Sequence, residues 1–167
     1  MGVPLSVAKE RLVSFAPIPM RSQLLRCNGL TILNDCYNAN PLSFARALET
    51  LRDLTARRKV AIVGDMLELG AYAEAAHQAI GRLATQLGID TVIAIGEYAD
   101  HVAKGVREGR AEAIAIFRTV PELLEALPAM LQEGDGLLIK GSRKLNLEQI
   151  TEFLLQRYRG ADGEHAR

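Results

Sequence analysis

The sequence has no tryptophan, few aromatic residues of any kind and no excess of one charge. Its 167 residues include four Tyr and four Phe, too few rings to expect a stacking surface for nucleic-acid bases. Twenty Lys and Arg balance twenty Asp and Glu, so the charge gives no reason to expect a nucleic acid or an anionic membrane as partner. No apolar run approaches the roughly 20 residues that cross a bilayer as a helix.

Cysteine is equally scarce. Cys27 and Cys36 are the only two and belong to no CxxC pair, so we expect reduced thiols and no metal site. The N-terminal stretch MGVPLSVAKERLVSF carries Lys9, Glu10 and Arg11 inside its apolar pattern, unlike a signal peptide, so we expect a cytoplasmic protein. No GxxxxGK[ST] segment is present, so the chain lacks the P-loop that holds a nucleoside triphosphate and its Mg²⁺.

Hydrophobic residues make up 49% of the chain, enough to close a core, and apolar strands alternate with helical patterns. We expect strands at 23–27, 30–34, 59–64, 91–96, 113–117 and 136–141. The first two would be joined by an Asn-Gly turn. We expect helices at 41–54, 73–88, 98–107, 120–132 and 146–158.

The strand segments VAIV, VIAI and LLI are short, continuously apolar and rich in β-branched residues. Such segments are typical of parallel strands covered on both faces, and their alternation with helices favours βαβ units. The sequence therefore predicts an α/β fold: an open, mostly parallel, Rossmann-like sheet with an antiparallel hairpin at one edge.

A short helix precedes this alternation. Apolar residues recur at helical spacing in residues 5–15, and the prolines of SFAPIP then end the helix. We expect residues 1–17 to be a helix and linker that belong to something N-terminal. Residues 18–158 would form the domain, and the polar residues 159–167 a frayed tail.

Polar residues gather in the loops that follow strands, which is where open α/β sheets bind ligands. These loops are DCYNANP (35–41), GDMLELG (64–70), GEYAD (96–100) and KGSRK (140–144). The loops at the opposite strand ends hold ordinary turn residues. The asymmetry predicts a binding site along one rim of the sheet.

In the first of these loops, Asn40 and Pro41 suit the N-cap and first position of the next helix. Asn38 suits a turn, and Tyr37 could belong to the site or simply pack. Asp35 ends a buried strand, where a carboxylate needs a partner. Ribose hydroxyls are one candidate.

In the fourth loop, Lys140 ends an apolar strand, where a lysine is costly unless it meets an anion. Gly141, Ser142 and Arg143 follow just before a helix, and together they favour an anion site. The acids of GDMLELG, Asp65 among them, could simply cap the following helix.

The segments DCYNANP, GDMLELG, EAAHQAIG and KGSRKLNLEQI, in this order, resemble the C-terminal domain of the Mur ligase family, from about Arg21 to Leu155. YNANP is similar to the segment of the members that add D-alanyl-D-alanine to UDP-N-acetylmuramoyl-tripeptide. Their reaction serves peptidoglycan synthesis, and with it cell-wall biogenesis, cell shape and cell division. One departure is Cys36, where the family usually has a small hydroxyl residue.

The resemblance implies an ATP-dependent amide ligase of three domains. ATP activates the substrate carboxylate as an acyl phosphate, the amine attacks, and cations and Mg²⁺ neutralise the charge in a site completed by domain closure. ATP and Mg²⁺ are thus expected in the full-length enzyme, with the UDP-sugar tripeptide and P-loop in missing domains. The helix before Pro17 resembles the last helix of the central domain. This chain alone would be inactive and bind no cofactor tightly.

Residue by residue, the resemblance implies three sets of site residues and leaves Glu68 and His77 without a role. The nucleotide group has Asp35 at the ATP ribose, with Tyr37, Asn38 and Asn40 lining that side of the cleft. The catalytic residues would be Arg21, which approaches the phosphates on closure, and Lys140. The loop that faces the incoming dipeptide would comprise Lys140, Gly141, Ser142 and Arg143.

Two other hypotheses stay open. The chain could be a free-standing nucleotide- or anion-binding α/β module without ligase activity. It could also be a structural domain whose polar loops only cap helices.

Overall fold

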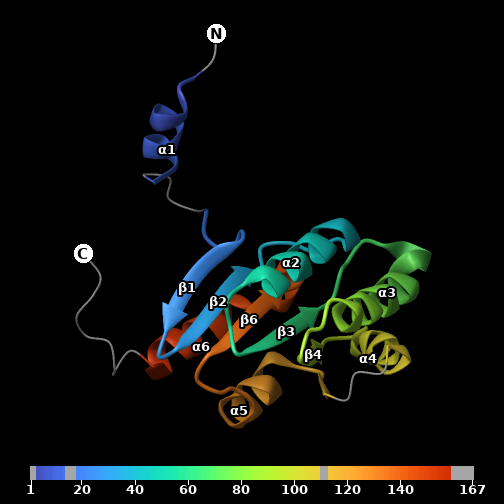
Figure 1. Ribbon diagram of the computed structural model, residues 1–167. Coiled ribbons are helices and arrows are strands. Elements are labelled where there is room, and N and C mark those ends of the chain that lie inside the picture. The colour runs from blue at the N-terminus through green and yellow to red at the C-terminus, as the bar shows by residue number, and fades with distance from the viewer. Residues whose placement is uncertain (1–2, 14–17, 110–112, 159–167) are drawn as a thin grey trace.

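The computed structural model describes residues 3–13, 18–109 and 113–158 (Figure 1). The strands are β1 (Gln23–Cys27), β2 (Leu30–Asp35), β3 (Arg58–Gly64), β4 (Thr91–Ile95), β5 (Ile114–Phe117) and β6 (Asp135–Lys140). The α-helices are α1 (Leu5–Val13), α2 (Pro41–Asp53), α3 (Ala73–Gln86), α4 (Ala99–Glu108), α5 (Val120–Met130) and α6 (Glu148–Tyr158). Two short 3₁₀ turns, η1 (Gly70–Tyr72) and η2 (Arg143–Leu145), precede α3 and α6.

The strands form one sheet in the order β1-β2-β6-β3-β4-β5. β1 runs antiparallel to β2, and every other neighbouring pair is parallel. Asn28 and Gly29 both have positive φ, 42° and 75°, as a tight hairpin turn between twisted strands requires. The predicted fold class and edge hairpin are confirmed, and the predicted bounds of the sheet and its helices differ from the observed ones by at most two residues.

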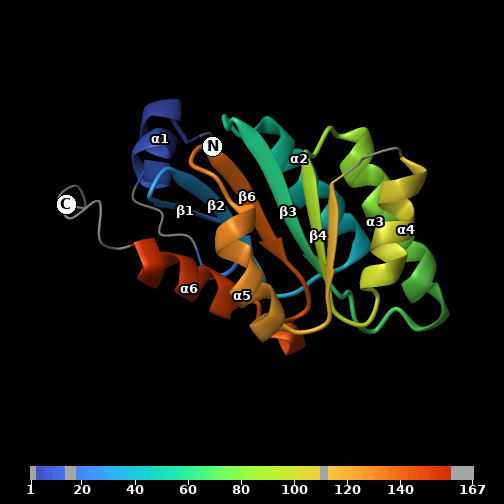
Figure 2. The same ribbon diagram turned by 90° about the horizontal axis from the view of Figure 1, so that it is seen from below.

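Helices cover both faces of the sheet (Figures 1 and 2). On one face, α2, α3 and α4 pack against side chains such as Val63. On the other face, α5 and α6 pack against side chains such as Ile62. Successive residues of a strand point to opposite faces, so a strand covered on both sides is apolar throughout. This explains why residues 60–63 are all fully buried.

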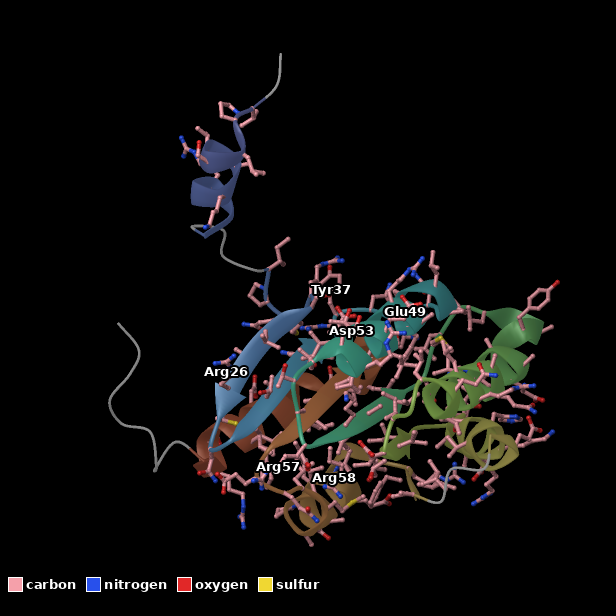
Figure 3. All side chains as sticks on the ribbon, viewed as in Figure 1. Arg26, Tyr37, Glu49, Asp53, Arg57 and Arg58 are labelled. Atoms are coloured by element: carbon pink, nitrogen blue, oxygen red, sulfur yellow. The ribbon has the colours of Figure 1, made fainter. Side chains whose placement is uncertain are left out.

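A charged pair lies at each end of β6. At its start, Arg58 pairs in register with Asp135, and their side chains form an ion pair at 2.7 Å. Figure 3 labels Arg58 at the end of the sheet opposite Tyr37. At the other end of β6, Lys140 pairs in register with Asp35. The first pair lies at the rim whose loops hold ordinary turn residues, and the second lies at the rim with the polar loops.

The N-terminal helix α1 lies apart from the sheet (Figure 1). Its Leu5 side chain is 86% exposed, and Val7 is also exposed. Residues 14–17 of the predicted linker and the predicted tail, 159–167, lie outside the described residues. Among the described helices, none combines the length and apolarity needed to span a membrane.

Candidate functional site

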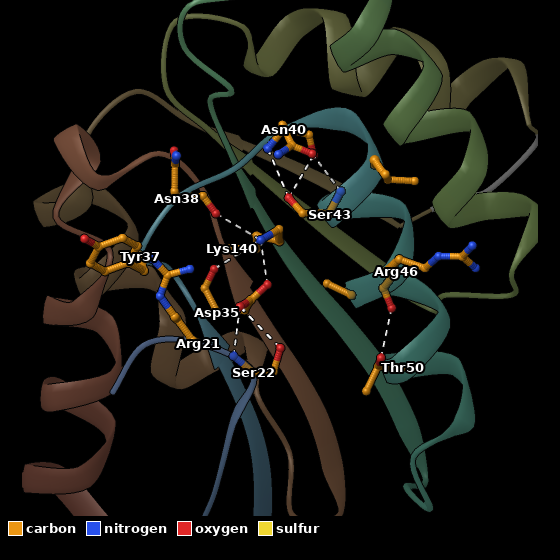
Figure 4. Close-up of a pocket in the computed structure, with 12 residues that line it drawn as sticks. Arg21, Ser22, Asp35, Tyr37, Asn38, Asn40, Ser43, Arg46, Thr50 and Lys140 are labelled. Carbon is orange, nitrogen blue, oxygen red and sulfur yellow. Dashed lines mark hydrogen bonds and ion pairs between the residues drawn. The ribbon is translucent and has the colours of Figure 1, made fainter. Parts of the chain in front are cut away.

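The ion pair between Asp35 and Lys140 joins the ends of β2 and β6 at the polar rim (Figure 4). Lys140 Nζ lies 2.5 Å from Asp35 Oδ2, and it also donates to the carbonyl oxygens of Asn38 (3.0 Å) and Asp35 (3.4 Å). The three contacts match the three N–H donors of an ammonium group. Lys140 is 2% exposed and Asp35 is 16% exposed. The lysine charge is therefore neutralised within the protein, while the carboxylate of Asp35 stays partly exposed.

The other carboxylate oxygen of Asp35 holds the segment before β1. Asp35 Oδ1 accepts hydrogen bonds from the Ser22 N–H (2.8 Å) and the Ser22 hydroxyl (3.5 Å). The N–H of Tyr37 donates to the Met20 carbonyl (3.1 Å). The guanidinium carbon of Arg21 lies 4.0 Å from the centre of the Tyr37 ring, a cation–π contact. Arg21 is thus held against the loop that follows β2.

Two non-glycine residues around Arg21 have left-handed backbones. The φ angles are 62° at Met20 and 44° at Ser22. Such angles cost energy for residues with a β-carbon and persist where the surroundings impose them. Here the hydrogen bonds to Asp35 and Tyr37 supply that constraint. The sequence offered no signal for this turn because neither position is glycine.

A first pocket of about 550 Å³ opens beside this ion pair (Figure 4). It is lined by the segment before β1, the loop after β2 and one side of α2: Arg21, Ser22, Asp35, Tyr37, Asn38, Asn40, Leu42, Ser43, Arg46, Ala47, Thr50 and Lys140. The start of α2 is fixed by a capping box, in which Asn40 Oδ1 accepts from the Ser43 N–H and Ser43 Oγ accepts from the Asn40 N–H. The predicted N-cap at Asn40 and Pro41 in the first turn are confirmed.

A second pocket, of about 780 Å³, lies on the other side of the Tyr37–Asn40 loop. It is lined by Met20 from the segment before β1 and by the loops after β2, β3 and β6: Tyr37, Asn38, Ala39, Asn40, Leu67, Glu68, Leu69, Ser142, Arg143 and Lys144. Ser142 and Arg143 line this pocket, whereas Lys140 lines the first one. The structure thus separates Lys140 from the other side chains of its loop and groups it with Asp35.

Gly141 lies where two backbones come close. A β-carbon at this position would lie 3.0 Å from the Cα of Gly64 and 2.7 Å from a methyl carbon of Leu147, closer than packed side chains allow. The contact joins the ends of β3 and β6, which pair directly in the sheet. Gly141 therefore lets the loops after these strands pass close together.

Asp65, at the end of β3, ties the loops of the rim to one another. Its carbonyl accepts from the Ser142 N–H at 2.8 Å. Its carboxylate, 6% exposed, accepts from the N–H groups of Glu97 (2.9 Å) and Tyr98 (3.0 Å), just before α4. The possibility that Asp65 caps the following helix, α3, is wrong, because α3 has no side-chain cap. The carboxylate instead satisfies the backbone of the neighbouring loop.

His77 contacts both the loop after β3, through Met66, and the loop after β4, through Tyr98. Its side chain is 1% exposed and stacks on Tyr98, with ring centres 4.5 Å apart. Nε2 accepts from the Met66 N–H (2.8 Å), so the ring proton lies on Nδ1, which donates to the Ala73 carbonyl (2.6 Å). Burial lowers the pKa of His77 below its usual 6.5. The imidazole is therefore neutral at neutral pH and acts as a fixed acceptor.

The thiol of Cys36, just after β2, is unreactive. The Cys36 thiol is fully buried and donates to Asn34 Oδ1 at 3.0 Å. Burial raises its pKa from 9.0 to about 11. It therefore supplies no thiolate nucleophile at neutral pH.

Several residues of the two pockets were not anticipated from the sequence. Arg46 and Thr50 line the first pocket from α2, outside the predicted loops. Leu67, Leu69 and Lys144 line the second from two of the predicted loops, but were not singled out as site residues. The spacing of Leu42, Arg46 and Thr50 by four positions places them on one side of a helix. That signal becomes readable only once this side of α2 is known to face the rim.

Comparisons with known proteins agree with this architecture. The chain is 36% identical over 155 residues to the UDP-N-acetylmuramoyl-tripeptide–D-alanyl-D-alanine ligase of Treponema pallidum, an alignment covering 92% of this chain and 34% of the relative. MurF from Acinetobacter baumannii superposes with a TM-score of 0.78 at 25% identity, over 92% of this chain and 34% of that one. MurF ligase from Thermotoga maritima, in complex with ADP, superposes with a TM-score of 0.73 at 23% identity, over 92% and 37%.

The chain spans about a third of the length of the curated relatives it matches. The family model described as Mur ligase, glutamate ligase domain, matches residues 20–143. This region runs from the turn around Arg21 to the loop after β6, and so includes the residues that line both pockets except Lys144. By this match, the chain belongs to the Mur ligase family.

Proposed function

We propose that the chain is the C-terminal domain of an ATP-dependent ligase that adds D-alanyl-D-alanine to UDP-N-acetylmuramoyl-tripeptide in peptidoglycan synthesis. In this proposal it binds the incoming dipeptide and closes over ATP, and it is inactive alone. The names of the relatives support this assignment, as does the share of their length that the chain covers. The observation that carries it is the pair of pockets on either side of one loop, the first with Arg21 and Asp35 and the second with Ser142 and Arg143.

The first pocket is our candidate for the nucleotide. ADP is bound in the Thermotoga maritima relative, and the residues here suit such a ligand. The partly exposed Asp35 carboxylate already accepts from Ser22 and Lys140, and its remaining lone pairs can accept hydrogen bonds from ribose hydroxyls. The Arg21 guanidinium can meet phosphate oxygens with two parallel hydrogen bonds. Tyr37, Asn38 and Asn40 form the wall between the two pockets.

Bound ATP would supply the phosphoryl group that activates the substrate carboxylate. The residues of this chain would orient the nucleotide and, on domain closure, bring the Arg21 charge to its phosphates. Lys140 contributes through Asp35, since its three donors already hold that residue and the Asn38 carbonyl. The described residues contain no group of three or more His, Cys, Asp or Glu that could hold a metal ion.

The second pocket is our candidate for the dipeptide. Ser142 and Arg143 can donate hydrogen bonds to its terminal carboxylate, and Gly141 lets their loop lie close to Gly64. Residues 1–17, with the exposed helix α1, would be the last helix and linker of a central domain. Residues 18–158 would form the C-terminal domain. We place the ligase in the cytoplasm, where ATP is available.

The test uses the complete ligase with the substitution Arg143→Ala. We expect the KM for D-alanyl-D-alanine to rise about tenfold, because a charge-assisted hydrogen bond is lost, while the KM for ATP changes little. Arg107→Ala, an exposed arginine on α4, is the matched control. Unchanged dipeptide KM in the Arg143 variant would remove this pocket from the proposal. Asp35→Asn tests the first pocket in the same way, through the KM for ATP.

A further inference from the structure

We propose that Glu68 binds the ammonium group of the incoming dipeptide in the second pocket, and that His77 is a positioning residue for the loop that presents it. The inference rests on the proposed function and deepens it. Neither residue had a role from the sequence. The structure gives Glu68 a place in a pocket and His77 a contact with the backbone of the same loop.

The second pocket combines both signs of charge with apolar surface. Arg143 and Lys144 bring cations from the loop after β6, and Glu68 brings a carboxylate from the loop after β3. Leu67 and Leu69 add apolar lining. A dipeptide of small residues is a zwitterion whose charged ends lie at most about 7 Å apart. The pocket therefore offers a partner for each end and an apolar surface for the methyl groups.

Glu68 has an uncommitted carboxylate. Its side chain is exposed in the pocket and makes no hydrogen bond or ion pair with another described residue. By contrast, Arg143 lies 3.5 Å from Glu148 and contacts the sulfur of Met20, so its position is partly set by the protein. Glu68 is thus an available acceptor for a ligand cation.

The backbone at Glu68 is left-handed, with φ of 65°. This conformation favours glycine or asparagine and is strained for glutamate. Two residues later, Gly70 also has positive φ, 54°, and a β-carbon there would meet nothing within 4 Å. A strained residue with a free polar side chain, lining a pocket, is typical of a functional position rather than of a structural turn.

The loop that carries Glu68 is fastened at its start. The Met66 N–H donates to His77, and the Asp65 carbonyl accepts from Ser142. The second bond ties the Glu68 loop directly to the loop of Arg143. The separation between the acidic and basic sides of the pocket is therefore set by the protein, and His77 is the side chain that holds the acidic side.

The experiment uses the complete ligase with Glu68→Asn, which suits a left-handed backbone but has no charge. Two probes are compared: D-alanyl-D-alanine as substrate, and propionyl-D-alanine, which lacks the ammonium group, as competitive inhibitor. We expect the dipeptide KM to rise about tenfold, while the inhibition constant of propionyl-D-alanine and the KM for ATP stay unchanged. Glu74→Gln, an exposed glutamate on α3, is the matched control and should change neither constant.

If Glu68→Asn weakens both probes equally, or neither, the ammonium contact is overturned. The proposed function is judged separately, because Arg143→Ala should weaken both probes through their shared carboxylate. The role of His77 is tested with His77→Leu, which removes the acceptor, and His77→Gln, whose side-chain oxygen can replace it. We expect a raised dipeptide KM in the first variant and partial recovery in the second. Equal KM values in both variants and the unaltered enzyme would overturn the positioning role.

Discussion

Lys140 and Asp35 face each other across the neighbouring strands β6 and β2, with 2.5 Å between ammonium and carboxylate. The two partners are unequally buried, at 2% and 16% exposure. Removing the acid leaves a buried charge without a partner, whereas removing the lysine leaves a carboxylate that water can reach. The pair is therefore expected to respond asymmetrically to substitution.

We predict that Asp35→Ala lowers the free energy of unfolding by about 3–5 kcal/mol, as for other broken buried pairs. Lys140→Met should cost less, about 1–3 kcal/mol, because its partner is partly hydrated. Urea denaturation of the chain measures both. Equal losses would mean that the lysine charge is hydrated after the acid is removed, contrary to its burial.

The pairing of these two residues also marks the limit of what the sequence could predict. The continuous apolar runs predicted parallel strands, and the common rim of Asp35 and Lys140 followed from that. Their mutual contact did not, because it depends on the register between strands 105 residues apart. From the sequence, each side chain seemed to need a partner from a ligand. In the structure, the two side chains form an ion pair with each other.

The same limit applies to the backbone of the site. Left-handed angles at Met20, Ser22 and Glu68 carry no local signal, because none of these residues is glycine or asparagine. Asp65 bonds the backbone of Glu97 and Tyr98, more than 30 positions away. Local propensity predicted the helices, strands and the Asn40 cap, while long-range hydrogen bonds decided the shape of the pockets.

The stacking of Arg21 on Tyr37 predicts that an aromatic ring is needed at position 37, with or without its hydroxyl. In the complete ligase, Tyr37→Phe should leave the KM for ATP and kcat nearly unchanged. Tyr37→Leu should lower kcat/KM for ATP about twofold to fivefold, since cation–π contacts between exposed side chains contribute about 0.5–1 kcal/mol.

A double-mutant cycle then tests whether Tyr37 acts through Arg21. Once Arg21→Ala is present, adding Tyr37→Leu should have little further effect, because the partner of the ring is already gone. Additive losses in the double variant would show that Tyr37 acts independently of the arginine.

The buried imidazole of His77 predicts a stability that depends on pH. Burial is the main cause of its lowered pKa, and the nearby His101 lowers it further, whereas the hydrogen bond to Ala73 and the charge of Asp65 raise it. The unfolded chain thus binds a proton at higher pH than the folded one. The free energy of unfolding should fall as pH falls below about 6.5, by up to about 1.4 kcal/mol per pH unit.

Urea denaturation between pH 7.5 and pH 5 measures this slope. His77→Gln removes the titrating group, so the difference between the unaltered chain and the variant isolates its contribution from those of the carboxylates. A difference that stays constant across this range would contradict the assignment of a neutral, buried His77.

The left-handed backbone of Glu68 predicts that Glu68→Gly, although it removes the proposed ligand contact, does not lower the free energy of unfolding. Glu68→Gly relieves a strain of about 1–2 kcal/mol and adds about 0.5–1 kcal/mol of conformational entropy to the unfolded chain. The free energy of unfolding should therefore stay the same or rise by up to about 1.5 kcal/mol. Glu125→Gly, at an exposed position inside α5, should instead lower it by about 1 kcal/mol. If both variants lose the same stability in urea, the Glu68 backbone is not strained, and its left-handed angle is no argument for a functional role.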